Sequence, residues 1–378
     1  MNSFDVIIIG GGIVGLACAR EAAQSGLRTA VIERAVIGGG ATAEGMGHIV
    51  VMDDSEAQFA LTRYSQLLWQ ELAAEWPASA EYEQCGTLWV ATDEEEMAEV
   101  RRKRAFYGAR GINSEELDAQ QLAEAEPNLR AGLAGGLFVP SDGVSYPPCA
   151  AAHLLSKAQQ HSAELFLGKN VAAIKGERVS LSDGTTLSAR FIVNATGSWS
   201  PELTPGIDVQ KRKGHLVITD RYPGFVRHQL IELGYLKSAH THNSASVAFN
   251  AQPRKTGQIL IGSSRQFGVD TRTVDPPMLS WMLRRASEYM PGIARLSALR
   301  VWTGFRAATS DHLPLIGPVP DHEHLYLATG HEGLGITTSL GSAKLLVDEL
   351  LQRSSAIPRA PYLPARAAVQ QHAEAVHA

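Results

Sequence analysis

The sequence contains little cysteine, few aromatic residues and no long apolar run. Its three cysteines, Cys18, Cys85 and Cys149, are scattered and odd in number, which argues against a disulfide framework and a metal cluster. No apolar stretch approaches the roughly 20 residues that span a bilayer. The first residues, MNSFDVIII, lack the basic region of a secretory signal. We therefore expect a cytoplasmic protein without an integral membrane segment, with a peripheral position on the inner membrane left open.

An excess of basic charge is also absent, since 34 Lys and Arg stand against 39 Asp and Glu, for a net charge of -5. The two signs are interspersed, so we expect no nucleic-acid partner. The basic clusters at 101–104 and 211–213 are predicted to be solvated faces. Docking of a partner subunit or an electron carrier is the alternative interpretation.

A glycine cluster follows the first apolar run, where residues 8–15 read IIGGGIVG. Gly10, Gly12 and Gly15 form G-x-G-x-x-G between a predicted strand, DVIII, and a helical pattern that stops at Gly26. A second strand, RTAVIE, then ends on Glu33. Glycines permit the turn and the approach of a pyrophosphate to the helix N-terminus, and the acid receives ribose hydroxyls. The unit predicts a bound dinucleotide.

Later segments of the chain decide between a flavin and a nicotinamide dinucleotide. Residues 35–48 are again rich in glycine, and a hairpin signal at Asp183-Gly184 precedes an apolar strand that ends at 195–197. Residues 324–351 repeat the order strand, glycine turn, helix. The two glycine turns imply that both ends of the chain meet on one extended ligand, and the helix near Ile336 is suited to the pyrimidine edge of a flavin. A nicotinamide enzyme would leave these later segments unexplained.

The stretches ATAEGMG, VNATGSWS, GFRAATSDHLPLIG and ATGHEGLGITTSLG occur together with the first glycine motif. In this combination and order the chain resembles the D-amino-acid oxidase and glycine oxidase superfamily of FAD-dependent amine oxidoreductases. ILIGSSRQFGVDTRTVD and PYLPARA resemble its branch of bacterial D-amino-acid and D-hydroxyproline dehydrogenases, alongside glycine oxidase and hydrogen cyanide synthase subunits. The resemblance covers nearly the whole chain.

This resemblance implies an α/β fold in which a Rossmann-like FAD-binding domain is interrupted by a substrate domain. We expect 1–84, 145–210 and 300–378 in the FAD domain. Strand-like patterns such as GTLWVAT and QILIGS place 85–144 and 211–299 in the substrate domain, as a mixed β-sheet over the flavin.

The resemblance also implies residues that contact the substrate. Arg306 is expected to hold a substrate carboxylate in a bidentate pair and to border the flavin, with a structural ion pair, for example to Asp311, as the alternative. Phe249, Asn250 and Glu332 are expected to line the substrate site, although a slip of one residue would turn the wrong face of the 249–250 strand inward. His48 and His331 are the remaining catalytic candidates, and each is open to a purely structural interpretation.

The cofactor is expected to be FAD, held without a covalent bond because the last cysteine, Cys149, precedes the C-terminal segment. No metal is expected. The predicted FAD contacts come from all three segments of the FAD domain. They are Gly10, Gly12, Gly15, Glu33, Arg34, Ala41, Thr42, Gly45, Met46, Gly47, Val171, Ala195, Thr196, Gly197, Trp199, Arg306, Gly330, His331, Gly333, Leu334, Gly335, Ile336 and Thr337.

By resemblance the reaction is oxidation of the C–N bond of a small amino acid, with hydride transfer from Cα to flavin N5 and an imine product. A D-amino acid, with D-4-hydroxyproline as a specific candidate, is the first expectation for the substrate, and a dehydrogenase is favoured over an oxidase. The alternatives are a glycine or sarcosine oxidase and a flavin-binding electron-transfer subunit of a hetero-oligomer. A tRNA-modifying flavoenzyme would require a basic face, which the net charge disfavours.

Overall fold

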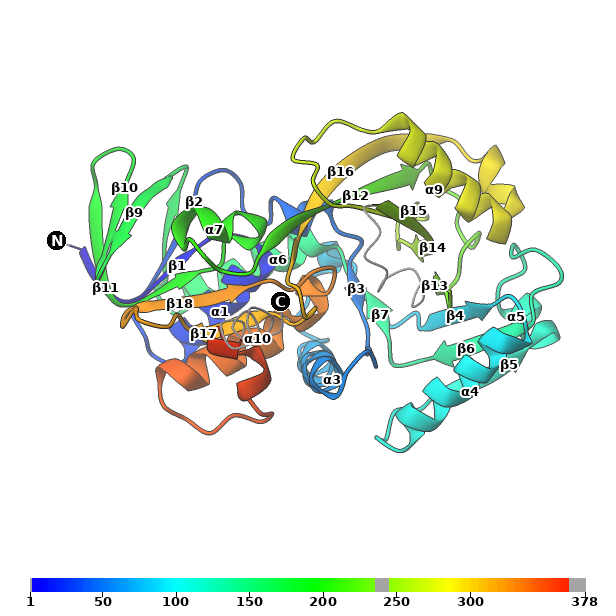
Figure 1. The fold of residues 1–378 in the computed structure, drawn as a ribbon, viewed down its shortest axis with the longest axis horizontal. Coiled ribbons are helices and arrows are strands. Elements are labelled where there is room, and N and C mark those ends of the chain that lie inside the picture. The colour runs from blue at the N-terminus through cyan, green and yellow to red at the C-terminus, as the bar shows by residue number, and fades with distance from the viewer. Residues whose placement is uncertain (1, 235–244, 367–378) are drawn as a thin grey trace, which may run out of the picture.

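The computed structural model describes residues 2–234 and 245–366. Figure 1 shows two lobes, one around β1 and α1 and the other around β4, β14 and α9. The strands of β12 and β16 reach from one lobe into the other. The expected mixed α/β architecture is confirmed.

The first sheet has the strand order β17-β18-β11-β1-β2-β8, with β10 and β9 added beside β11. Its central strands are parallel, as in a dinucleotide-binding fold. Its strands are β1 (Asn2–Ile9), β2 (Thr29–Glu33), β8 (Glu164–Leu167), β9 (Val171–Lys175), β10 (Arg178–Leu181), β11 (Thr186–Asn194), β17 (Leu315–Pro318) and β18 (Leu325–Thr329).

The second sheet is mixed and has the order β16-β12-β15-β14-β13-β4-β6-β5. It contains β4 (Thr87–Ala91), β5 (Glu115–Asp118), β6 (Gly135–Val139), β12 (Gln210–Thr219), β13 (Gln229–Glu232), β14 (Ala245–Pro253), β15 (Ile259–Gln266) and β16 (Ala298–Ala308). A short pair, β3 (His48–Ile49) and β7 (Gly143–Val144), lies between the two large sheets in sequence and in space.

The helices of the described residues pack around the two sheets, with α9 against the second sheet (Figure 1). They are α1 (Ile13–Gln24), α2 (Ala41–Glu44), α3 (Glu56–Glu71), α4 (Glu94–Gly108), α5 (Ala119–Ala125), α6 (Pro147–Gln160), α7 (Ser200–Leu203), α9 (Pro276–Tyr289) and α10 (Gly335–Leu350). Several begin at a side-chain cap, for example Ser55, whose oxygen accepts the backbone N–H of Gln58 at the start of α3. No helix of the described residues is long and apolar enough to cross a membrane.

Burial on both faces of the first sheet explains the continuous apolar run of β1. This strand is an interior parallel strand with helices on one face and the β9–β10 side on the other, so Val6, Ile7 and Ile8 are all fully buried. The predicted helix stop at Gly26 and the hairpin at Asp183-Gly184 are both confirmed, and both glycines have a positive φ. The glycines in the sequence therefore predict correctly where these elements end.

The expected domain boundaries can be compared with the membership of the two sheets. Residues 300–308 were assigned to the FAD domain, but they lie in β16, which pairs with β12 in the second sheet. The boundaries between the two units stay a prediction, and residues 235–244 and 367–378 lie outside the described part of the chain.

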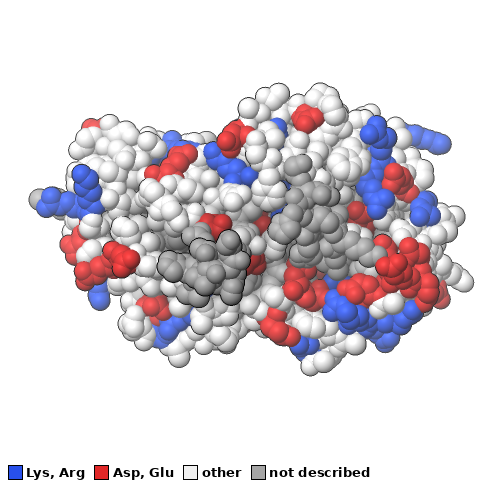
Figure 2. Space-filling model, in the orientation of Figure 1, with Lys and Arg blue, Asp and Glu red and all other residues white. Residues whose placement is uncertain are grey.

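The surface view shows how the charges are distributed on one face. In Figure 2 lysine and arginine side chains are interspersed with acidic ones, and both signs gather over α4. Arg101 and Arg102 on this helix pair with Glu94 and Glu99. The expectation that 101–104 is a solvated face holds for three of its residues and is wrong for Lys103, which is fully buried against Asp53 and lies 4.4 Å from the centre of the Trp89 ring.

The glycine turn gives a direct test of the packing between β1 and α1. A Cβ atom at Gly15 would stand 2.1 Å from the backbone oxygen of Gly10, so Gly15→Ala must displace the helix from the strand. We expect this change to lower the stability of the protein by about 1–3 kcal/mol. Thermal unfolding of the cofactor-free protein measures the effect. The control is Gly108→Ala, at the end of α4, where no atom lies within 4 Å of the added methyl group. Equal melting temperatures for the two variants would contradict the packing argument.

Candidate functional site: a cavity at the meeting of the two sheets

One cavity of about 470 Å³ runs along the carboxyl ends of the first sheet and continues beneath the second. Its floor includes the ends of the parallel strands β1, β11 and β18, at Gly10, Ala195 and Thr329. Its other side is formed by residues of β12, β14, β15 and β16. The carboxyl edge of a parallel sheet is the usual ligand site of such folds.

The first end of the cavity is built around the N-terminus of α1. Its N-cap, Gly12, carries no side-chain cap, and the Ile13 N–H donates to Thr42 Oγ1 at 3.0 Å. Glu33 accepts the backbone N–H groups of Gly11 and Ala35, each at 2.7 Å, which fixes the carboxylate at the cavity wall. An uncapped helix start beside a fixed acid suits a pyrophosphate and a ribose.

A second helix start enters the cavity from the C-terminal segment. Gly333, Gly335 and Ile336 line the cavity where α10 begins, and this N-terminus also has no side-chain cap. His331 lines the same turn, but its Nε2 pairs with Ser342 Oγ at 2.9 Å. Burial lowers the pKa of His331 to about 3, so the ring is neutral.

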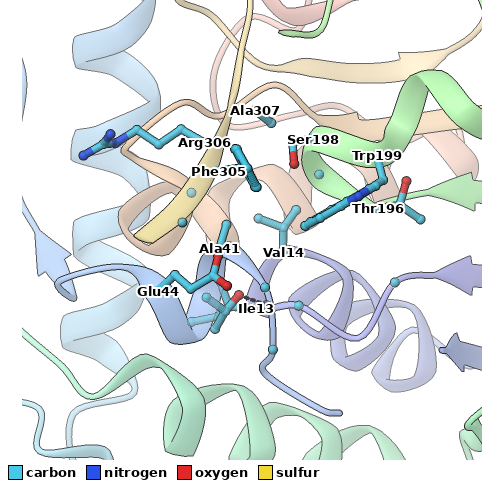
Figure 3. Close-up of a pocket in the computed structure, with 18 of the residues that line it drawn as sticks. Ile13, Val14, Ala41, Glu44, Thr196, Ser198, Trp199, Phe305, Arg306 and Ala307 are labelled. Carbon is cyan, nitrogen blue, oxygen red and sulfur yellow. Dashed lines mark hydrogen bonds between the residues drawn. The ribbon is translucent and has the colours of Figure 1, made fainter. Parts of the chain in front are cut away.

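Arg306 reaches the cavity from β16, and Figure 3 shows its side chain extending away from Trp199. Its guanidinium lies over Gly214 of β12, where a Cβ atom would stand 2.3 Å from the nearer terminal nitrogen. Arg306 Nη1 donates to the Ser264 carbonyl at 3.0 Å. Asp311 pairs with Arg366 at 2.8 Å, so Asp311 as the structural ion-pair partner of Arg306 is wrong.

His48 and Asn250 are neighbours in the wall of the cavity. His48 Nδ1 pairs with Gln229 Oε1, and Asn250 Nδ2 lies 3.2 Å from His48 Nε2. Burial, with a smaller contribution from the charge of Arg306, lowers the pKa of His48 to about 4. The His48 ring is therefore neutral near pH 7, and its two nitrogens are engaged by amide side chains.

Most residues that the sequence nominated lie on this cavity. Their roles toward a cofactor or a substrate stay predictions. Those on the cavity are Gly10, Gly12, Glu33, Arg34, Ala41, Thr42, Gly45, Met46, Gly47, His48, Val171, Ala195, Thr196, Gly197, Trp199, Asn250, Arg306, Gly330, His331, Glu332, Gly333, Gly335 and Ile336.

Four nominated residues lie elsewhere. Phe249 was expected to contact the substrate, and this is wrong: it is fully buried on the other face of β14, stacked on Tyr289 of α9 at 4.7 Å. Gly15 packs behind the turn, Leu334 packs into a neighbouring apolar core, and the Thr337 hydroxyl donates to the His48 carbonyl at 2.8 Å. These three do not line the cavity, although each supports a segment that does.

Other parts of the site were not predicted from the sequence. Glu44 Oε2 and Ser198 Oγ are buried cavity atoms without a hydrogen-bond partner in the described residues. Burial raises the pKa of Glu44, and its other oxygen pairs with Arg272. The cluster 211–213 was expected to be solvated, and this is wrong, since Arg212 pairs with Glu332 at 2.9 Å and Lys213 is almost fully buried. The burial and pairing of these residues depend on contacts with distant segments, which the sequence alone does not show.

Comparison with known proteins agrees with this architecture. Residues 5–349 match the model of the FAD dependent oxidoreductase family. The chain belongs to this family. It is 28% identical to the glycine oxidase of Geobacillus kaustophilus over 96% of each protein, and 28% identical to the hydrogen cyanide synthase subunit HcnC of Pseudomonas aeruginosa over 100% of this chain and 99% of that one.

Solved structures show the same fold. The crystal structure of glycine oxidase from Geobacillus kaustophilus matches with a TM-score of 0.86 at 27% identity, covering 96% of this chain and 98% of that one. The L-proline dehydrogenase of P. horikoshii matches with a TM-score of 0.85 over 97% of this chain and 98% of that one. At 23% identity this second likeness concerns the fold alone.

The cavity fits the FAD of this family. Uncapped starts of α1 and α10 face it, glycines leave room for close backbone approach, and Ser198 Oγ offers an unpaired hydroxyl. None of the three cysteines lines it. We therefore expect acid precipitation to release FAD into the supernatant, whereas a flavin that stayed with the pellet would contradict non-covalent binding.

The buried histidine gives a test of the electrostatics. Because the folded protein keeps His331 neutral to a pKa of about 3, the unfolded chain binds a proton first, below the ordinary value of 6.5. Wild-type stability relative to His331→Gln should therefore fall by about 2 kcal/mol between pH 7.5 and pH 5. Urea unfolding midpoints of both cofactor-free proteins at the two pH values measure this difference. An unchanged difference would mean that His331 ionises in the folded protein.

Proposed function

We propose that the protein oxidises the C–N bond of a small amino acid to an imine with bound FAD. The observation that carries the proposal is Arg306, a guanidinium that reaches the cavity from β16 and donates to the Ser264 carbonyl at its wall. A carboxylate is the natural ligand of such a planar fork, and pairing would fix the orientation of the adjacent Cα–H. Relatives named as glycine oxidases support an amino-acid substrate.

When bound, FAD supplies the acceptor for the hydride that leaves Cα. The protein's own residues supply binding and orientation. Arg306 would hold the carboxylate, and the neutral His48 beside Asn250 borders the place where the amine would lie. The uncapped start of α10 would stabilise negative charge on the reduced flavin ring. No group at Cα has to act as a strong base in this scheme, so catalysis depends mainly on orientation.

For the substrate we propose a D-amino acid first, with D-4-hydroxyproline as the specific candidate that the branch resemblance suggests. Glycine or sarcosine is the second candidate, which the relatives named glycine oxidase favour. The relative named as a subunit of hydrogen cyanide synthase favours a partner subunit, and transfer of electrons to such a partner is the alternative to oxygen as acceptor.

The carboxylate contact is tested by Arg306→Met. We expect kcat/KM for the best amino acid to fall at least about 100-fold, because paired hydrogen bonds to a desolvated carboxylate are worth about 3 kcal/mol. Initial rates with an artificial dye as electron acceptor measure this for an oxidase and a dehydrogenase alike. Arg300→Met is the control, since Arg300 lies on the same strand but is exposed and stacks on Trp302. A surface change of this kind should alter kcat/KM less than about twofold. Full activity of Arg306→Met would contradict the proposed function.

A further inference from the structure

One buried acceptor on the cavity wall has no partner among the described residues. Asn250 lies on β14, is only 5% exposed and lines the cavity. Its Nδ2 is engaged by His48, whereas its Oδ1 has no hydrogen-bond partner. Buried polar atoms are almost always paired, and an unpaired carbonyl loses its hydration without compensation. Asn250 Oδ1 is therefore available to accept a hydrogen bond from a ligand in the cavity.

A chain of hydrogen bonds fixes the orientation of this amide. Gln229 Oε1 pairs with His48 Nδ1, and Gln229 Nε2 donates to Thr87 Oγ1 at 3.0 Å. The Thr87 side chain in turn lies against the carboxyl group of Asp142, where its interaction opposes the rise in pKa that burial causes. Four of these five residues are less than 6% exposed, so water does not replace the links.

A buried carboxyl group lies at the inner end of this chain. Asp142 Oδ1 accepts the Val51 N–H at 3.1 Å and the Gln66 amide at 2.8 Å. Burial raises the pKa of Asp142 to about 7, and the Thr87 side chain opposes that rise, as an O–H directed toward the carboxyl group would. The Thr87 oxygen then accepts from Gln229, whose carbonyl must accept the Nδ1–H of the neutral His48.

The assignment of donors and acceptors continues from His48 to Asn250, which lines the cavity. With its proton on Nδ1, His48 presents a lone pair at Nε2, and only the NH₂ group of Asn250 can satisfy it. The carbonyl oxygen of Asn250 is left facing the cavity. The reverse orientation would break the match at His48 and place two acceptors or two donors against each other somewhere in the chain.

The acceptor and the guanidinium of Arg306 lie along the same stretch of the second sheet. Asn250 is the register partner of Gly262 on β15, and Arg306 donates to the carbonyl of Ser264, two residues further along that strand. The charge of Arg306 also acts on the ring of His48. A cation and a neutral acceptor at neighbouring points are complementary to a carboxylate and an N–H group on one carbon.

We propose that Asn250 Oδ1 accepts the N–H of the substrate amine, and that His48 and Gln229 are positioning residues that hold this carbonyl toward the cavity. This inference rests on the proposed function, in which Arg306 binds the carboxylate. It assigns the selection of primary and secondary amines to Asn250, since a tertiary amine or an ether at the same place offers no donor in its neutral form.

Two flat carboxylates that cannot be oxidised at Cα test the contact without turnover. Pyrrole-2-carboxylate carries an N–H where 2-furoate carries an oxygen, and both offer the same carboxylate to Arg306. Titration of the FAD-loaded protein at pH 8, followed by the change in flavin absorbance, gives both dissociation constants. We expect pyrrole-2-carboxylate to bind at least about tenfold more tightly, because a furan oxygen would face the lone pairs of Asn250.

The variants separate this contact from general damage. Asn250→Leu should abolish the preference, because pyrrole-2-carboxylate loses its acceptor and 2-furoate loses the repulsion from it. Asn250→Ala serves where the leucine variant fails to retain FAD. Gln229→Leu should reduce the preference in the same way by releasing His48. Gln266→Met is the matched control, since it removes a buried amide, also with an unpaired oxygen, from β15 outside the cavity.

The possible outcomes distinguish the two claims. Equal binding of the two ligands by the wild type, or a preference that survives in both Asn250 variants, would overturn the role of Asn250 and leave the proposed function standing. Tighter binding of 2-furoate would show that the NH₂ group of Asn250 faces the cavity. Failure of both ligands to perturb the flavin at millimolar concentration would count against carboxylate binding itself, and so against the proposed function.

Discussion

Close contact between backbone segments at the end of β1 is the constraint on which the site depends. A Cβ atom at Gly10 would stand 2.6 Å from the Ala195 carbonyl, and one at Gly15 would stand 2.1 Å from Gly10 itself. These contacts hold β1, α1 and the end of β11 together at one edge of the sheet. The helix N-terminus and the strand ends consequently open on the same cavity, and α10 reaches that edge from the far end of the chain.

The second sheet supplies the residues of the cavity that we propose to select the substrate. Gly214 of β12 leaves the space that the guanidinium of Arg306 fills, and β14 presents Asn250 on one face and Phe249 on the other. In the proposed function, the edge of the first sheet would hold the FAD and the side chains of the second sheet would contact the substrate. A cation and a polarised amide in a mostly buried cavity interact more strongly with a ligand than they would in water.

The sequence predicted what local pattern and backbone geometry determine. The glycines of the first turn, the acid at Glu33 and the start of the last helix near Ile336 all lie where their spacing placed them. The choice between Phe249 and Asn250 depends on which face of β14 packs against α9, and alternation along the strand does not decide that. The pairing of His48 with Gln229 joins residues 181 positions apart, so no local signal announces it. Likewise, the burial of Lys103 and Lys213 depends on partners from distant segments, which a run of basic residues does not show.

The most direct measurement is anaerobic mixing of the FAD-loaded protein with D- and L-amino acids, glycine, sarcosine and the hydroxyproline isomers, followed at about 450 nm, the band of oxidised flavin. We expect at least one small α-amino acid to bleach the flavin absorbance rapidly. The corresponding carboxylate that lacks the amine should not bleach it. A yellow protein that no member of the panel reduces would contradict oxidation of an amino acid while leaving FAD binding intact.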